Sequence, residues 1–221
     1  METTVFTDPK NSVYKYESHS QSDAAWVYVT TKRKGINADI KKNCQAAIIR
    51  EAKRRIEAQQ NAAFKWMKDP YRPAFGGALS VPDCVHAIYA HILTGDVNYL
   101  KAVILASQTG AGANPLNMSY TTGVGHKYPK NPLHIDSRVS LQDAPAGITV
   151  LGPVDYTALG ESDLYYHKVA GKYCYPEINK WPVIESYWDV FWYPMMCEFT
   201  IQNNIAPNAF VWGYLAARGI K

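Results

Sequence analysis

The sequence predicts an all-α protein whose helices carry long irregular loops, and three observations support this fold class. Apolar side chains recur at helical spacing from Asp39 to about Trp66. Two more helical patterns follow Ser80 and are separated by only about two or three residues, which is typical of an antiparallel hairpin. After Gly110 regular patterns become scarce for about 70 residues, and a last apolar helix closes the chain. We therefore expect helix hairpins that carry loops toward one end of the molecule.

Size and composition are those of a core-forming protein. The 221 residues suffice for one large domain or two small ones, and 47% hydrophobic and 19% charged residues are ordinary values. The 16 Tyr and 6 Trp combine flat apolar faces with hydrogen-bonding tips, which suits wet clefts and interfaces. The net charge of +4 is mild and no base-stacking motif accompanies it, so we expect no nucleic-acid partner. No apolar run reaches the roughly 18 residues of a membrane span, and no signal peptide is visible.

The N-terminal region shows little periodicity. Residues 1–24 are polar and rich in Ser, and we expect a poorly ordered lead-in there, followed by one unit over residues 25–221. The run Trp26–Val29 has strand propensity but also fits the tail of a helix, and the pattern leaves both open.

The first long helix has clear start and stop signals. Either Asn37 or Asp39 can cap its N-terminus. Asp69–Pro70 stops it, because the residue before a proline avoids helical geometry. Its basic side chains are interpreted as a solvated face, and they are Lys41, Lys42, Arg50, Lys53, Arg54 and Arg55.

The two following helices are predicted from capping patterns. Ser80 with Asp83 three residues later resembles a capping box, and Asp96 caps the second helix. His86 and His91 are five residues apart and fall on different helix faces, which argues against a metal-binding pair.

The segment Gly112–Arg138 is the most informative loop of the chain. Its Gly, Pro and Asn content excludes a helix, whereas its aromatic and imidazole side chains distinguish it from a disordered linker. These side chains are Tyr120, His126, Tyr128 and His134. We hypothesise that the segment forms one wall of a polar, aromatic-lined site that binds sugar.

Glu198 is the strongest single candidate for chemistry. It stands among apolar neighbours in Pro194–Ile201, where burial would keep a carboxyl group protonated as a general acid requires. The local sequence fits equally a glutamate that caps a helix end or pairs with an arginine. Beyond it, Asn208 is expected to cap the last helix, Ala209–Ala217.

Other polar residues have open roles. His126 and His134 lack a third ligand at metal-binding spacing, so either sugar contacts or loop hydrogen bonds explain them. Asp136 and Arg138 form a local ion pair, a substrate clamp, or both. The four Cys residues show no metal spacing and are expected to be free thiols.

Several of these blocks together resemble glycoside hydrolase family nine, the cellulase-type β-glucanases built on an (α/α)6 barrel. The blocks are Asn114–Gly125 (Asn-Pro-Leu-Asn-Met-Ser-Tyr-Thr-Thr-Gly-Val-Gly), Pro129–His134, Gly147–Pro153 and the region of Glu198 and Asn204, preceded by Thr94–Leu100. The similarity covers roughly residues 25–217 and implies the C-terminal portion of such a barrel.

The resemblance also implies roles for residues. Glu198 matches the general acid that protonates the departing glycosidic oxygen. His134 matches the second position of a His-His-Arg loop that contacts sugar, although Leu133 and Ile135 replace the flanking His and Arg. Substrate binding is assigned to His134, Tyr120, His126, Arg138 and Asn204, with no metal and no cofactor.

The family's catalytic base comes from a paired-aspartate motif, and nothing like Asp-Ala-Gly-Asp occurs among the 19 acidic residues here. A six-hairpin barrel also needs about twelve helices, and the patterns support roughly four or five. The resemblance therefore implies a partial catalytic domain that lacks its base.

Taken together, we expect hydrolysis of β-1,4-glucosidic bonds in cellulose or related β-glucans by an inverting mechanism, with little activity of the chain alone. A non-catalytic carbohydrate-binding or assembly module derived from such an enzyme is the alternative. Expected partners are a β-glucan oligosaccharide or polysaccharide, and either an N-terminal complementing chain or a second copy. The resemblance implies a secreted or periplasmic location.

Overall fold

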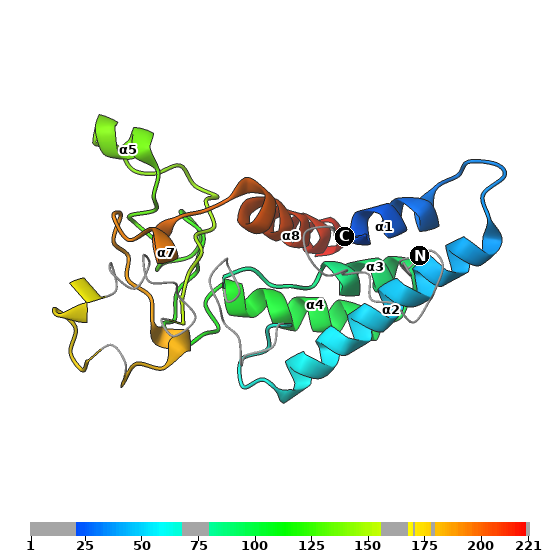
Figure 1. Ribbon diagram of the computed structural model, residues 1–221, viewed down its shortest axis with the longest axis horizontal. Coiled ribbons are helices and arrows are strands. Elements are labelled where there is room, and N and C mark those ends of the chain that lie inside the picture. Colours follow the sequence, from blue (N-terminus) through cyan, green and yellow to red (C-terminus); the bar gives the residue numbers. More distant parts are fainter. Residues whose placement is uncertain (1–20, 68–79, 156–167, 170, 178–179, 220–221) are drawn as a thin grey trace.

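The computed structural model describes residues 21–67, 80–155, 168–169, 171–177 and 180–219 (Figure 1). Most of the expected lead-in, the loop around Gly76–Gly77 and the aromatic segment 165–167 lie outside the described residues. The described elements are α1 (Ser22–Thr30), α2 (Ala38–Asn61), α3 (Val85–Thr94), α4 (Val97–Gly110), α5 (Ile135–Ser140), η3 (Val183–Glu185), α7 (Pro194–Cys197), η4 (Ile201–Ile205) and α8 (Ala206–Gly219).

The arrangement confirms the all-α prediction. Within the described residues, β-pairing is limited to one isolated bridge between Thr121 and Thr149. In Figure 1 the helices α1 to α4 lie at one end of the molecule, and the loops that carry α5, η3 and α7 lie at the other. The helix α8 lies between these ends and packs on α3 and α4.

The run Trp26–Val29 is helical and belongs to α1. Ala25 and Val29 are both buried against Cys44 and Ile48 of α2, whereas Val27, which a strand would place on the same face as these two residues, is 64% exposed. Trp26 stacks flat on Tyr89 of α3, with ring centroids 4.0 Å apart. Burial of one helical face therefore overrides the strand propensity of this run.

The helix α2 starts as predicted and ends earlier. The side chain of Asn37 accepts hydrogen bonds from the backbone N–H groups of Asp39 and Ile40, so Asn37 is the cap. The helix ends at Asn61, where the buried Gln59 amide donates to the carbonyls of Lys65 and Ala102 and turns the chain. The expected end near Trp66 was therefore wrong by about one turn.

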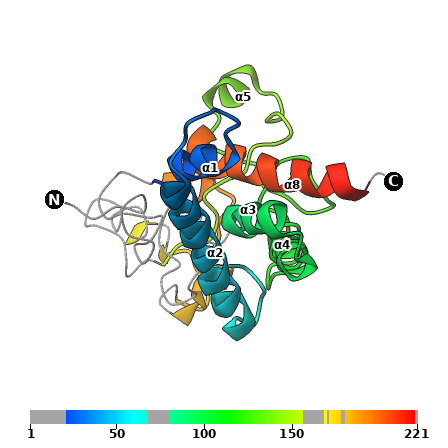
Figure 2. The same cartoon turned by 90° about the vertical axis from the view of Figure 1, so that its right-hand side faces the viewer.

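The hairpin of α3 and α4 forms, but its start was misassigned. The helix α3 begins at Val85, and Ser80 instead donates its hydroxyl to the carbonyl of Leu151. Asp96 caps α4 as predicted, because its carboxylate accepts from the N–H of Asn98. Figure 2, turned by 90° from Figure 1, shows the hairpin of α3 and α4 lying beside α2.

The last helix also begins differently from the prediction. A π-helical turn, η4, precedes it, and the side chain of Thr200 caps that turn by accepting from the N–H of Asn203. The helix α8 then starts at Ala206, so Asn208 lies inside it and is not its cap.

All four cysteines, Cys44, Cys84, Cys174 and Cys197, are free, as the sequence predicted. None of the helices in the described part of the chain has the length and hydrophobicity that a membrane span needs.

Buried polar side chains connect α1, α2 and α3 with the segment that precedes α3. Arg55 of α2 is 7% exposed and pairs with both Glu51 and Asp83, so its place on a solvated face was wrong. His86 is fully buried and bonds the hydroxyl of Ser22 at 3.0 Å. Burial and the nearby Arg55 guanidinium lower the pKa of His86 to about 3.

This network predicts a loss of stability in mild acid. In the unfolded chain His86 binds a proton below its ordinary pKa of 6.5, whereas in the folded chain it stays neutral until about pH 3. The free energy of unfolding should therefore fall by about 2 kcal/mol between pH 7 and pH 5, measured by urea unfolding. In the variant His86→Gln this fall should shrink to a few tenths of a kcal/mol. Equal falls in the two proteins would contradict the assignment.

Candidate functional site

The segment that carries Glu198 is held by backbone hydrogen bonds on two sides. The N–H of Leu133 donates to the carbonyl of Cys197 at 2.7 Å. On the other side, the N–H groups of Leu151 and Gly152 donate to the carbonyls of Glu198 and Met196 at 2.8 and 2.9 Å. Three segments that are far apart in sequence are thus fixed side by side, with Glu198 in the middle one.

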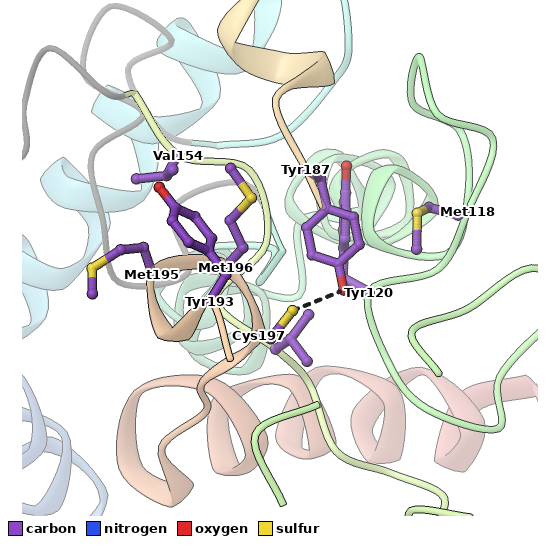
Figure 3. Close-up of a cluster of buried hydrophobic side chains, with 9 residues drawn as sticks. Met118, Tyr120, Val154, Tyr187, Tyr193, Met195, Met196 and Cys197 are labelled. Atoms are coloured by element: carbon purple, nitrogen blue, oxygen red, sulfur yellow. Dashed lines mark hydrogen bonds between the residues drawn. The ribbon is translucent and has the colours of Figure 1, made fainter. Parts of the chain in front are cut away.

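A sulfur-rich and aromatic cluster lies beneath this segment (Figure 3). Its buried members are Met118, Tyr120, Val150, Val154, Tyr187, Tyr193, Met195, Met196 and Cys197. The three residues before Glu198 are all members, so burial of their side chains anchors the short helix α7. Anchoring on both backbone and side chains leaves the Glu198 carboxylate on a rigid base.

The Glu198 side chain is itself only half-buried. It follows α7 in extended backbone geometry, with φ −67° and ψ 162°. No group in the described ranges donates a hydrogen bond to its carboxylate or forms an ion pair with it. The arginine pairing that the local sequence allowed is therefore not seen within those ranges, and the carboxylate is free to meet a ligand.

His134 lies on the neighbouring segment and has a defined orientation. Its Nδ1 accepts from the backbone N–H of Ser137 at 3.3 Å and lies 2.7 Å from the Ser137 hydroxyl. Its ring stacks on Phe199, the residue after Glu198, with centroids 6.3 Å apart and planes 26° apart. Because Nδ1 is an acceptor, the neutral ring carries its proton on Nε2, which is then a donor for a ligand.

A pocket of about 280 Å³ opens beside His134. Phe191 forms one wall, and the Arg138 guanidinium lies over its ring, 4.9 Å from the centroid. The sequence left open whether Asp136 and Arg138 form a local ion pair. Within the described residues they do not, and the Arg138 guanidinium has no carboxylate partner there. The full lining is Lys130, Asn131, Pro132, His134, Ser137, Arg138, Leu141, Gln142, Asp143, Ala144 and Phe191.

The other predicted binding residues lie elsewhere. Tyr120 is 1% exposed and meets Tyr187 edge to face, and burial raises the pKa of its hydroxyl. Asn204 is fully buried, and its side-chain oxygen accepts from the N–H and the hydroxyl of Thr200. His126 is exposed on the loop. A sugar could reach Tyr120 or Asn204 only if the surrounding segments moved, so their binding roles stay predictions.

Asp189 is a structural residue that the sequence analysis missed. Its carboxylate accepts from the backbone N–H groups of Lys130 and Asn131 at 2.6 and 2.9 Å, and so holds the floor of the pocket. About 60 residues separate these partners, and no local spacing links them. Asp189 stands between Trp188 and Val190 in the sequence, a setting without any motif.

Three buried side chains that the sequence did not predict as a group hold the loop around Thr121 in place. The amide group of Asn208 donates to the hydroxyls of Thr121 and Thr149 at 3.1 and 2.8 Å, and these hydroxyls lie 2.9 Å apart. All three side chains are buried. Asn208 of α8 therefore connects the loop that contains Gly123 and Gly125, here called the Gly-x-Gly loop, to the segment after Gly147.

The described residues do not include a metal centre. No three His, Cys, Asp or Glu side chains of the described ranges lie close enough to hold a metal ion.

Comparisons with known proteins place this fold. No family profile matches the chain, and no curated protein matches its sequence. Solved structures do match: the glycoside hydrolase family 9 endoglucanase J30 (TM-score 0.73, 20% identity, 91% of this chain and 35% of that chain) and a family 9 protein of Bacteroides ovatus (0.68, 21%, 94% and 35%). A third is AaCel9A, solved in complex with a cellobiose-like isofagomine (0.69, 19%, 87% and 35%). The chain thus has the fold of a part of these proteins and spans about a third of their length.

The role of Asp189 can be tested directly. Replacing it by Ala removes the acceptor for two backbone N–H groups, so the free energy of unfolding should fall by about 1–3 kcal/mol. Hydrogen exchange of the Lys130 and Asn131 amides should also accelerate. The matched control is Asp143→Ala, an exposed carboxylate on the same pocket, which should change both measurements little. Unchanged amide exchange in Asp189→Ala would contradict the holding role.

Proposed function

Because the chain shares the fold of a part of family 9 endoglucanases, we propose that it is the acid-bearing part of a β-glucan hydrolase. The proposed reaction is inverting hydrolysis of β-1,4-glucosidic bonds in cellulose or related β-glucans. The observation that carries the proposal is the Glu198 carboxyl group, which is rigidly mounted, half-buried and without a partner in the described structure. The ring of His134, an oriented donor, stacks on Phe199, the residue that follows Glu198.

The proposed mechanism assigns one step to Glu198. Its carboxyl group donates a proton to the glycosidic oxygen as the bond from that oxygen to the anomeric carbon breaks. A water molecule forms the new bond from the opposite face of the sugar, and a second carboxylate about 6.5–9.5 Å from the acid takes up the proton of that water. We propose that a partner chain supplies this second carboxylate, because the sequence contains nothing like the Asp-Ala-Gly-Asp motif that carries the base.

His134 has a binding role in this proposal. Its Nε2–H donates to a hydroxyl of the sugar next to the scissile bond, while Ser137 and Phe199 hold its ring. Phe191 beside Arg138 offers an apolar face on which a neighbouring sugar ring can stack.

The missing base requires a partner, for which an N-terminal complementing chain is our first choice. The outer face of α4 supports this, because Val97, Ile104 and Leu105 are 50%, 40% and 43% exposed at spacings of seven and eight residues. An apolar stripe of this spacing is typical of a helix that packs on another helix. Self-association through the same face is the second choice.

A carbohydrate-binding module without activity is the alternative function. Two exposed indole rings favour it, since Trp192 is 48% and Trp212 is 38% exposed. Flat aromatic rings at a surface suit stacking on sugar rings. This alternative needs neither a base nor the Glu198 proton.

Glu198→Gln separates the two functions. We expect little hydrolysis of mixed-linkage glucan by the chain alone. Addition of the endoglucanase segment with the paired-aspartate motif should restore reducing-sugar release, with α-anomeric product seen by NMR. Glu198→Gln should lower this rate by about 10²–10⁴-fold, because a general acid contributes that much. Glu185→Gln, on an exposed 3-10 turn, is the control and should keep full activity. Sugar binding that Glu198→Gln leaves unchanged, with no hydrolysis restored by the added segment, would favour the binding module.

The apolar face of α4 predicts association. In size-exclusion chromatography with light scattering, the chain should elute above its monomer mass of 24.8 kDa. Ile104→Glu should shift it toward the monomer, because the charge would be buried in the contact. Lys53→Glu, an exposed change on α2 and away from this face, should leave the mass unchanged. A wild-type monomer that binds no apolar dye would exclude this face as an interface.

A further inference from the structure

The pocket beside His134 carries two cations, although a neutral glucan offers no charge for them to meet. Lys130 and Arg138 both line it, and neither forms an ion pair with a described carboxylate. Each cation lies over an aromatic ring: the Lys130 ammonium 3.6 Å from the centre of Tyr128, and the Arg138 guanidinium over Phe191. Such contacts restrain a cation without neutralising its charge.

The carboxylates around the pocket do not cancel these charges. Asp143 is the one carboxylate that lines it, and its side chain is exposed. Asp189 lies beneath the loop, and its oxygens already accept from the backbone N–H groups of Lys130 and Asn131. The donors that the pocket offers include the two cations, the Nε2–H of His134 and the side-chain amide of Gln142, a set that favours an anionic ligand.

The size and shape of the pocket restrict the class of ligand that it can bind. A pocket of about 280 Å³ lies near the lower limit for small-molecule sites, which suits one sugar unit better than a larger group. Phe191 supplies a flat face for the ring of that unit, and Arg138 stands beside it with a planar fork that matches a carboxylate.

From this arrangement we propose that the pocket binds a sugar unit whose C6 is a carboxylate, so that the preferred substrate is an acidic β-glycan. This inference rests on the proposed function and specifies its substrate class. The carboxylate meets Arg138 and Lys130, the ring lies against Phe191, and His134 donates to a ring hydroxyl. The salt dependence of binding follows, because the charges lie near solvent.

The test compares two cello-oligosaccharides of the same length, one neutral and one with its C6 hydroxyls oxidised to carboxylates. By calorimetric titration at low salt, the oxidised form should bind about five- to twentyfold tighter, since each exposed charge pair contributes up to about fivefold. The advantage should shrink at 0.5 M NaCl. Acetate at the same carboxylate concentration should not displace the sugar.

Variants locate the effect. Arg138→Gln and Lys130→Gln should each reduce the preference for the oxidised form by about two- to fivefold, and Lys130→Gln should leave the affinity for the neutral form unchanged. Asp143→Asn should increase that preference, because it removes a like charge from the pocket. Lys101→Gln on α4 is the matched control and should have no effect. Thermal unfolding of all variants should match the wild type, because these side chains are exposed.

The outcomes are distinguishable. Equal affinities for the two sugars, or a preference that survives both cation variants, would overturn this inference and leave the proposed function standing. Displacement by acetate alone would show a carboxylate site without sugar recognition and would also overturn it. Binding of neither sugar would count against the proposed function itself.

Discussion

The candidate site depends on the backbone hydrogen bonds that fix the segment Met196–Glu198 between two others. Leu133 donates from one side, and Leu151 and Gly152 donate from the other. These bonds act as a short three-stranded pairing without forming a regular sheet. They bring the loop that carries His134 beside Glu198, although more than 60 residues separate the two in sequence. Without them, neither residue would have a defined relation to the other.

Burial and hydrogen bonding then make this junction rigid. The sulfur-rich cluster anchors the side chains before Glu198, Asp189 holds the loop at Lys130, and Asn208 locks the Gly-x-Gly loop to α8. Buried polar groups that are satisfied in this way specify one arrangement of the loops. Such rigidity is what a general acid needs, because proton donation depends on position more than on strength. The helices at the other end of the molecule provide the scaffold, with the buried Arg55 and His86 network in their midst.

Local sequence signals predicted the long helices well and the loops poorly. The expectation that Gly112–Arg138 holds no helix was wrong at its end, because the short helix α5 begins at Ile135 with the side chain of His134 as its cap. The helical repeat and the caps Asn37 and Asp96 identified α2 and α4, because these signals act within a few residues. Ser80 and Asn208 looked equally like caps, yet their hydrogen bonds go to Leu151 and to Thr121 and Thr149, which no local pattern reveals. Glu198 and His134 stand in recognisable local sequence blocks and were therefore predicted. Asp189 was not predicted, because its hydrogen-bond partners Lys130 and Asn131 are about 60 residues away in sequence. Tyr120 was predicted to bind sugar because it is an aromatic residue in the loop, but its burial follows from tertiary packing, which the local sequence does not show.

In the proposed mechanism a β-glucan lies across Glu198 and His134. A crystal structure of the chain with a bound cello-oligosaccharide tests this placement most directly. We expect a glycosidic oxygen about 2.6–3.2 Å from the Glu198 carboxyl group, with a hydroxyl of the adjacent sugar accepting from His134 Nε2. An oligosaccharide bound only at the exposed rings of Trp192 or Trp212, away from Glu198, would contradict it.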